Sequence, residues 1–209
     1  MGLFFTLEGP DGSGKSTQIR RLAERLEESG IRYLTTREPG GTPISDKIRA
    51  LLLDPDNREM TAKTEALLYA ASRAQHVAQV IRPALEQGVV VICDRYIDAS
   101  LAYQATGLGL SVDYVRELNR EATDGLWPTR TYLIDVPAEV GIGRVARSRG
   151  AGLDRIEQRD LHYHGRVRDQ FLQIAGEEPE RFRVLDGTRS IDEVTDAIWE
   201  DVRQFLNAD

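Results

Sequence analysis

The sequence is poor in cysteine, in excess positive charge and in long apolar runs. One cysteine among 209 residues excludes an intramolecular disulfide and a zinc site made of clustered cysteines. Asp and Glu (34) outnumber Lys and Arg (27), and the net charge is -7, which argues against binding to a nucleic-acid polymer or an anionic membrane. No run approaches the roughly 20 apolar residues of a membrane span. We therefore expect a cytoplasmic protein, with no membrane partner.

The composition is otherwise that of an ordinary globular chain. Apolar residues make up 41% and charged residues 29%, which is typical of a folded domain in water. At roughly 100–200 residues per domain, the length predicts a single domain over residues 1–209. Residues 1–6 contain no basic side chain, so we expect no secretory leader there.

Apolar runs of strand length alternate with longer helical patterns. We expect strands at 3–7, 31–36, 89–93, 131–136 and 182–186. Helical spacing is found at 15–29, 44–53, 61–86, 97–106, 112–123, 138–147 and 159–175, and a capping box at Ser190–Glu193 opens a last helix. Pro83 is expected to kink or end its helix. The alternation predicts an α/β fold with a five-stranded parallel sheet flanked by helices, in which ligands bind at the carboxyl ends of the strands.

The strongest motif follows the first strand. It has the form G-x-x-x-x-G-K-[ST], with a strand before it and a helix after it, which is the context of a phosphate-binding P-loop. Its glycines allow backbone N–H groups to converge on phosphate oxygens, and the helix N-terminus adds a positive dipole end. We expect ATP to contact Gly9, Pro10, Asp11, Gly12, Ser13, Gly14, Lys15, Ser16 and Thr17.

A second motif ends the most apolar strand. Asp94 and Arg95 come directly after residues 89–93. An acid at that place suits the Walker-B role of holding Mg²⁺, and we expect Asp94 and the Ser16 hydroxyl to be the metal ligands. Arg95 offers a forked donor for a phosphate. A plain ion pair at the strand end is the alternative interpretation.

Four arginines gather between residues 144 and 155, with two glycines among them. They are Arg144, Arg147, Arg149 and Arg155. A mobile basic segment of this kind can close over a transferring phosphoryl group as a lid, and we place this lid at about 144–157. A solvated helix end is the alternative.

Three further segments offer acceptor-site residues. The turn at 37–43 holds two prolines and two glycines, and the Glu38–Pro39 bond is a candidate for the cis form. Tyr69 and Arg73 share a helix face at i, i+4, where they could stack on a base and donate to it. Taken alone, the pair favours the alternative of a core tyrosine with a surface arginine. Residues 98–104 present Ser100, Tyr103 and Gln104 on adjoining faces. Cys93 is expected to pack as a small apolar group. The three histidines (His76, His162 and His164) show no metal-ligand spacing and are taken as structural or surface residues.

Together these motifs resemble the thymidylate kinases, in order and over essentially the whole chain. The resemblance rests on residues 8–17, 37–42, 69–76, 94–96 and the basic segment that ends at 153–157. It implies a P-loop NTPase fold of the nucleoside monophosphate kinase type, with a small lid. It also implies transfer of the γ-phosphate of ATP to dTMP, with Mg²⁺, by a homodimer for which residues 61–86 are a candidate face.

The resemblance also assigns roles to single residues. Lys15, Arg95, Arg147 and Arg149 would be catalytic, with the lid arginines serving the transferring group as in the bacterial arrangement, and Arg144 would lie nearer the adenine. Asp11 would orient either the deoxyribose or the phosphate-binding arginine. The acceptor site would comprise Asp11, Glu38, Arg49, Tyr69, Arg73, Arg95, Ser100, Tyr103 and Gln104. Tyr69 stands where the family more often has Phe, and its hydroxyl needs a partner.

Two alternatives remain open. One is another P-loop kinase, acting on a different nucleoside monophosphate or on an alcohol. An alcohol kinase would need a base near the acceptor, whereas Arg49, Arg73 and Arg95 indicate a second phosphate site. The other is a nucleotide-dependent switch, which would carry an N-K-x-D guanine motif after a later strand. The fourth strand instead ends in Asp135-Val136-Pro137.

Overall fold

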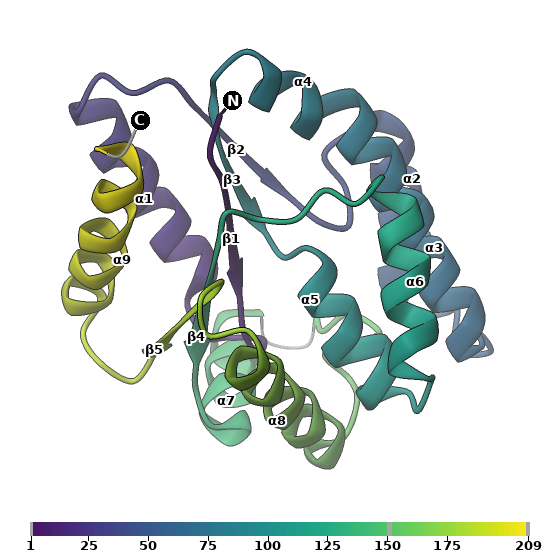
Figure 1. The fold of residues 1–209 in the computed structure, drawn as a ribbon. Coiled ribbons are helices and arrows are strands. Elements are labelled where there is room, and N and C mark those ends of the chain that lie inside the picture. The colour runs from purple at the N-terminus through teal and green to yellow at the C-terminus, as the bar shows by residue number, and fades with distance from the viewer. Residues whose placement is uncertain (1, 150–151, 208–209) are drawn as a thin grey trace.

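Five parallel strands form one sheet at the centre of the molecule (Figure 1). In this computed structural model, residues 2–149 and 152–207 are described, without the side chains of residues 148 and 149. The strands are β1 (Phe4–Glu8), β2 (Tyr33–Arg37), β3 (Val90–Asp94), β4 (Arg130–Asp135) and β5 (Phe182–Asp186). Their order across the sheet is β2-β3-β1-β4-β5. The predicted five-stranded parallel sheet is confirmed.

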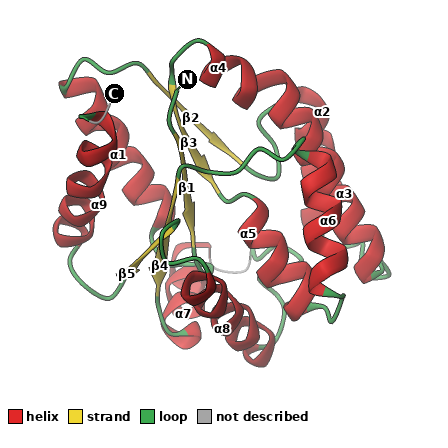
Figure 2. Ribbon diagram, in the orientation of Figure 1, coloured by secondary structure: helices red, strands yellow, loops and turns green. Residues whose placement is uncertain are grey.

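Helices cover both faces of the sheet (Figure 2). One face carries α1 (Lys15–Glu28) and α9 (Ile191–Leu206). The other side holds α2 (Pro43–Leu53), α3 (Ala62–His76), η1 (Val77–Ile81), α4 (Arg82–Glu86), α5 (Ile97–Ser100), η2 (Leu101–Gly107), α6 (Val112–Ala122), α7 (Ala138–Arg149) and α8 (Leu161–Glu177). Alternate residues of β3 pack into the two hydrophobic cores on opposite faces of the sheet. Val91 packs toward the α8 side, whereas Val90 and Ile92 pack toward α1 and α9. This period of two explains why β3 contains no polar residue before Asp94.

Pro83 does not end the helical run at 61–86. The chain passes from α3 through one π-helical stretch, η1, into α4 without a break. The N–H of Arg82 bonds to the carbonyl of Val77, five residues back. Proline has no N–H to give and is tolerated in the first turn of a helix, which is where Pro83 lies in α4. Wider hydrogen-bonded rings before the proline therefore keep the helix continuous.

The ends of the strands bring the predicted motifs to one edge of the sheet. β1 runs into the P-loop, β2 into the Glu38–Pro39 turn, and β3 into Arg95. The Glu38–Pro39 bond is cis, as predicted. The capping box at Ser190 and Glu193 is also present. No helix in the described part of the chain is long and apolar enough to cross a membrane.

Candidate active site

A cleft of about 510 Å³ opens at the carboxyl edge of the sheet. It is bounded by the P-loop, the turn after β2, the end of β3, helices α2, α3 and η2, and the two ends of the predicted lid segment 144–157. Both acidic and basic side chains line the cleft, although the chain as a whole carries a net negative charge. The lining residues are Asp11, Gly12, Gly14, Lys15, Ser16, Thr17, Arg37, Glu38, Pro39, Arg49, Leu53, Tyr69, Asp94, Arg95, Ala99, Tyr103, Gln104, Arg144, Val145, Asp154, Ile156 and Glu157.

The P-loop packs backbone against backbone on α7. A Cβ added to Gly12, whose φ is +74°, would lie 2.1 Å from the carbonyl oxygen of Gly141. A Cβ on Gly141 would in turn lie 2.3 Å from the carbonyl oxygen of Asp11. Gly14 begins α1 without a side-chain cap, so the first N–H groups of that helix are left for an anion. The loop and the helix that leads into the lid are thus in direct contact.

Lys15 is folded back onto the P-loop. Its Nζ donates to the carbonyl oxygens of Gly9 at 3.0 Å and Pro10 at 2.8 Å, and to Ser13 Oγ at 3.3 Å. Burial, followed by repulsion from Arg95, lowers the pKa of Lys15 to about 8. An anion bound in the loop would oppose both effects, because it favours the charged ammonium.

A hydrogen-bonded triangle beside the P-loop joins Asp11, Arg95 and Tyr103. Arg95 Nη2 donates to Asp11 Oδ1 at 2.6 Å and to the Tyr103 hydroxyl at 3.0 Å, and that hydroxyl donates to Asp11 Oδ2 at 2.9 Å. Arg95 Nη1 donates to the carbonyl of Gly9 at 2.9 Å. Burial would raise the pKa of Asp11, but Arg95 and Lys15 hold it below its ordinary value. Of the two roles expected for Asp11, this geometry matches the orientation of the arginine.

The backbone of Arg95 is left-handed, with φ +69°, a conformation that costs a non-glycine residue roughly 1–2 kcal/mol. Two hydrogen bonds hold it. The Arg95 N–H donates to Leu7 O at 3.1 Å, and the Tyr96 N–H donates to Glu8 Oε1 at 2.7 Å. Glu8 is fully buried, and burial, with repulsion from Asp98 second, raises its pKa to about 8. Glu8 belongs to the motif 8–17, but no role was assigned to it from the sequence, although an acid at the end of an apolar strand was a signal.

Ser16 and Asp94 lie together, as the sequence predicts. The Ser16 hydroxyl donates to Asp94 Oδ2 at 3.2 Å, and both residues line the cleft. A hydroxyl and a carboxylate side by side are hard oxygen donors, and Mg²⁺ takes such ligands while completing its shell with phosphate oxygens and water. The donor set fits a magnesium ion.

The residues predicted for the acceptor site, called the acceptor wall below, divide into residues that line the cleft and residues behind them. Tyr69, Gln104 and Arg49 line the cleft, and Arg49 Nη1 donates to Pro39 O at 2.9 Å. Arg73 and Ser100 do not line it. The Arg73 side chain is 1% exposed and donates to Glu38, Ser100, Asn119 and the carbonyl of Tyr96. The structure therefore places Arg73 behind the wall, where it holds Ser100, and not at the position facing a base that we expected.

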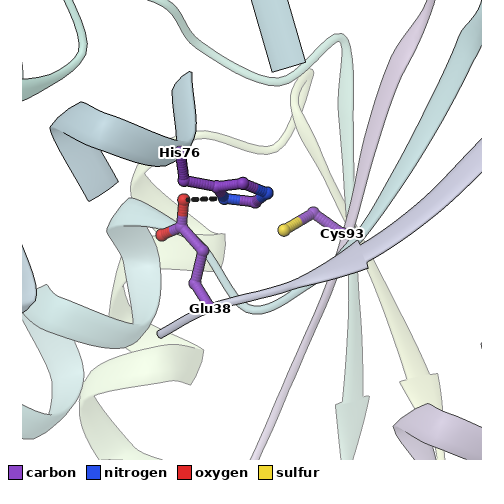
Figure 3. Close-up of side chains that lie close together, drawn as sticks. All are labelled: Glu38, His76 and Cys93. Atoms are coloured by element: carbon purple, nitrogen blue, oxygen red, sulfur yellow. Dashed lines mark hydrogen bonds and ion pairs between the residues drawn. The ribbon is translucent and has the colours of Figure 1, made fainter. Parts of the chain in front are cut away.

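Glu38, His76 and Cys93 meet behind the turn after β2 (Figure 3). His76 Nδ1 lies 2.9 Å from Glu38 Oε1, and its Nε2 lies 2.7 Å from the Thr36 hydroxyl. The Cys93 thiol donates to Arg95 O at 3.0 Å, and burial raises its pKa. The second Glu38 oxygen accepts from Arg73. The atoms of Glu38, His76 and Cys93 that could bind a metal are therefore already hydrogen-bonded. The geometry favours a buried support for the turn over a metal site, in keeping with the structural role expected for His76.

The predicted lid arginines differ in placement. Arg144 lines the cleft, and its guanidinium donates to Gly12 O at 3.3 Å and to Gly187 O at 3.2 Å. Arg147 is exposed, does not line the cleft, and donates through Nε to Gly143 O of its own helix. The side chain of Arg149 lies outside the described residues. Arg155, whose side chain is 9% exposed, donates to the buried Glu65 at 2.8 Å, and so is not a free cation of the lid.

Several lining residues were not singled out from the sequence. Arg37 directly precedes the turn already identified, so its place at a strand end was an available signal. Asp154 and Glu157 stood inside the segment that carried the resemblance. Leu53 and Ile156 are apolar residues that both line the cleft although they lie far apart in the sequence, and no local pattern marks them.

The sequence and the fold of this chain are similar to those of known proteins. A sequence model described as thymidylate kinase matches residues 7–198. The chain is 51% identical over 205 residues to a thymidylate kinase of Exiguobacterium sibiricum, covering 98% of this chain and 96% of that protein. It is 52% identical over 203 residues to one of Deinococcus radiodurans, covering 97% of each. The crystal structure of thymidylate kinase from Ehrlichia chaffeensis matches with a TM-score of 0.78 and 33% identity, over 97% of this chain and 98% of that one. This chain belongs to the thymidylate kinase family.

Proposed function

We propose that ATP is the phosphoryl donor and Mg²⁺ the cofactor in the phosphorylation of dTMP to dTDP that this member of the thymidylate kinase family catalyses. One observation carries the proposal. The cleft joins a P-loop to a second set of cations, Arg49 and Arg95, next to an aromatic ring and an amide. A site that must hold two anions end to end needs positive charge on both sides of the transferring group.

The proposed reaction needs alignment more than proton transfer. The second pKa of a phosphate monoester is near 6, so at neutral pH an oxygen of dTMP is already a nucleophile. It attacks the γ-phosphorus of ATP, the bond from that phosphorus to the β,γ-bridging oxygen breaks, and ADP leaves with the bonding electrons. Arg95, fixed by Asp11, would hold the acceptor phosphate, and Lys15 would move from the loop carbonyls to the β- and γ-phosphates.

Ser16 and Asp94 would hold Mg²⁺, which supplies positive charge that neutralises the phosphate oxygens. Arg144 bridges the P-loop and the turn after β5, on the side where the adenine is proposed to lie. Arg147 and Arg149 stay predicted lid residues, and closure of the segment 144–157 would bring their charge to the transferring group while excluding water.

The experiment is a coupled assay of ADP formation with ATP and a panel of acceptors. We expect dTMP to give the highest kcat/KM by at least tenfold over CMP, AMP and shikimate. Equal use of another acceptor would overturn the proposed acceptor in favour of a broader kinase. ATP hydrolysis that no acceptor stimulates would favour a nucleotide-dependent switch.

We also propose a homodimer and a cytoplasmic location. Leu67 of α3 is 46% exposed, and Ile44 and Leu51 of the adjacent α2 are 53% and 52% exposed. Such a face supports pairing of two copies through α2 and α3. Light scattering of the wild type and of Leu67→Lys tests this, with a dimer expected for the first and dissociation for the second.

A further inference from the structure

Glu65 is a buried acid of α3 that the proposed reaction does not use. It is fully buried, and Gln104 of η2 is 2% exposed. Gln104 Nε2 donates to Glu65 Oε1 at 2.9 Å. Gln104 lines the cleft, whereas Glu65 does not. Glu65 therefore lies one layer behind the acceptor wall and touches it through an amide.

The other oxygen of Glu65 is held by two guanidinium groups. Arg155 Nη2 and Arg159 Nη2 each donate to Glu65 Oε2 at 2.8 Å. Arg155 Nε also donates to Leu52 O at 2.8 Å, and Arg159 lies over the Tyr163 ring at 4.5 Å. A guanidinium can only donate. The side-chain atom of residue 65 that faces Arg155 and Arg159 must therefore be a hydrogen-bond acceptor.

The ion pairs also decide which way the Gln104 amide faces. Both oxygens of the Glu65 carboxylate accept, so the Gln104 nitrogen must point to Glu65. The amide oxygen of Gln104 is then the polar atom that remains for a ligand in the cleft. Amide orientation usually depends on such neighbours, because nitrogen and oxygen have nearly the same shape.

We propose that Glu65 is a positioning residue that selects the base of the acceptor, by fixing Gln104 with its amide oxygen toward the cleft. This inference rests on the proposed acceptor site. An amide oxygen accepts a hydrogen bond from the imide N3–H of thymine or uracil. Cytosine has an unprotonated N3, which would face that oxygen lone pair to lone pair. A site built around a hydrogen bond discriminates strongly against a base that cannot make it.

The substitution Glu65→Gln is expected to reverse the orientation of the Gln104 amide. Its amide oxygen must stay with Arg155 and Arg159, because they need an acceptor. Its amide nitrogen then points to Gln104 and requires an acceptor there, so the Gln104 amide flips and presents its NH₂ to the cleft. The change replaces one oxygen by one nitrogen of equal size, yet it reverses the hydrogen-bonding character of the wall.

A second substitution restores the wall. In Glu65→Gln/Gln104→Glu, the new amide nitrogen at 65 donates to one carboxylate oxygen at 104, and the other oxygen again faces the cleft as an acceptor. Gln104→Glu alone sets two carboxylates against each other and is expected to be impaired. A purely structural role for Glu65 predicts that the two changes add, whereas a positioning role predicts that the double variant recovers.

The experiment measures kcat and KM for dTMP and dCMP in the wild type, Glu65→Gln and the double variant. Where dCMP turnover is undetectable, its inhibition constant against dTMP replaces it. We expect Glu65→Gln to lower the preference for dTMP over dCMP by roughly 10- to 100-fold, mainly through the KM for dTMP, and the double variant to recover most of it. The KM for ATP should stay within about threefold in each variant. Glu59→Gln, the same change at an exposed position near the start of α3, is the matched control and should leave the preference unchanged.

An unchanged dTMP preference in folded Glu65→Gln, or a double variant no better than the single ones, overturns the inference. A wild type that fails to phosphorylate dTMP overturns the proposed function instead. If Glu65→Gln does not fold, the wild type is tested with dUMP and N3-methyl-dUMP. Loss of binding on N3-methylation by less than about fivefold would contradict imide recognition.

Discussion

The donor side and the acceptor side of the cleft are built in different ways. The donor side is one continuous segment, residues 9–17, whose backbone groups and Lys15 need only a strand before them and a helix after them. The acceptor side collects single side chains from β2, α2, α3, η2 and the C-terminal end of the predicted lid segment 144–157. Some of them are held by a buried partner far along the chain, as Glu65 holds Gln104, and Glu38 holds Arg73 in the layer behind.

This difference indicates where selectivity lies. A backbone loop recognises phosphate, which every nucleotide carries. The acceptor wall can distinguish bases because its side chains are fixed in one orientation by hydrogen bonds that leave a chosen atom free. Substitutions on the two sides should therefore separate catalytic rate from acceptor choice, and the following predictions test that separation, from the largest expected effect to the smallest.

Lys15→Ala removes the donor-side cation. We expect kcat to fall by roughly 10²- to 10³-fold, because the ammonium would neutralise charge on the transferring group. The KM for dTMP should change by less than about threefold, since the acceptor wall is untouched. Steady-state kinetics with both substrates varied check this. A large rise in the KM for dTMP would show that the two sides are not separate.

Arg95→Ala removes the cation of the acceptor side. We expect kcat/KM for dTMP to fall by roughly 100-fold through loss of a charged hydrogen bond to the acceptor phosphate. Binding of ATP, followed by calorimetry, should be largely intact. Because Arg95 also donates to Gly9 O of the P-loop, this variant is the sharpest test of separation. Equal loss of ATP and dTMP binding would count against its acceptor role.

Glu8→Gln tests the support beneath Arg95. The pKa of Glu8 is about 8 in the folded chain, against an ordinary value of 4.5. Between these values the unfolded chain releases a proton that the folded chain keeps, so Glu8 contributes less to stability as the pH rises. The variant has no such proton to release and keeps an oxygen for the Tyr96 N–H. Its free energy of unfolding, relative to the wild type, should rise from about pH 5 to about pH 8.

Urea unfolding across that pH range measures the trend for Glu8→Gln. Exposed Glu59→Gln serves as the control and should show no such trend. A constant difference between Glu8→Gln and the wild type would mean that Glu8 is ionised in the folded chain throughout this range.

Tyr103→Phe removes one corner of the triangle with Asp11 and Arg95. The hydroxyl both donates to the acid and accepts from the guanidinium. We expect kcat/KM for dTMP to fall by about fivefold, since a single hydrogen bond contributes about 1 kcal/mol. The KM for ATP should not move. A loss as large as that of Arg95→Ala would assign the hydroxyl a direct role in the reaction.

The fold and the donor side could be predicted from the sequence, because their signals are local. The apolar run at 89–93 is typical of a central strand that is covered on both faces. Residues 9–17 predict a phosphate-binding loop through the spacing of their glycines and lysine alone. The strand bounds differ from the prediction by one or two residues at most ends, since strand ends depend on which neighbour continues the ladder.

Placement on the acceptor side could not be predicted in the same way. Tyr69 and Arg73 share a helix face by spacing, yet only Tyr69 lines the cleft. The difference arises from Glu38 and Asn119, which engage Arg73 from 35 and 46 positions away. Glu65 carried no local signal either, because its partners lie 39 to 94 positions further along the chain. Long-range pairing of charges is the information that periodicity does not contain.

The left-handed backbone at Arg95 has a consequence for evolution and for engineering. Glycine adopts that conformation freely, so Arg95→Gly should unfold at a higher temperature than Arg95→Ala, while both lack the guanidinium. The guanidinium offsets this backbone cost, because it pairs with Asp11 and donates to the Tyr103 hydroxyl and to the carbonyl of Gly9. A design that replaces Arg95 to relieve the backbone therefore also breaks this ion pair, and selection on the fold as well as on turnover acts to retain the arginine.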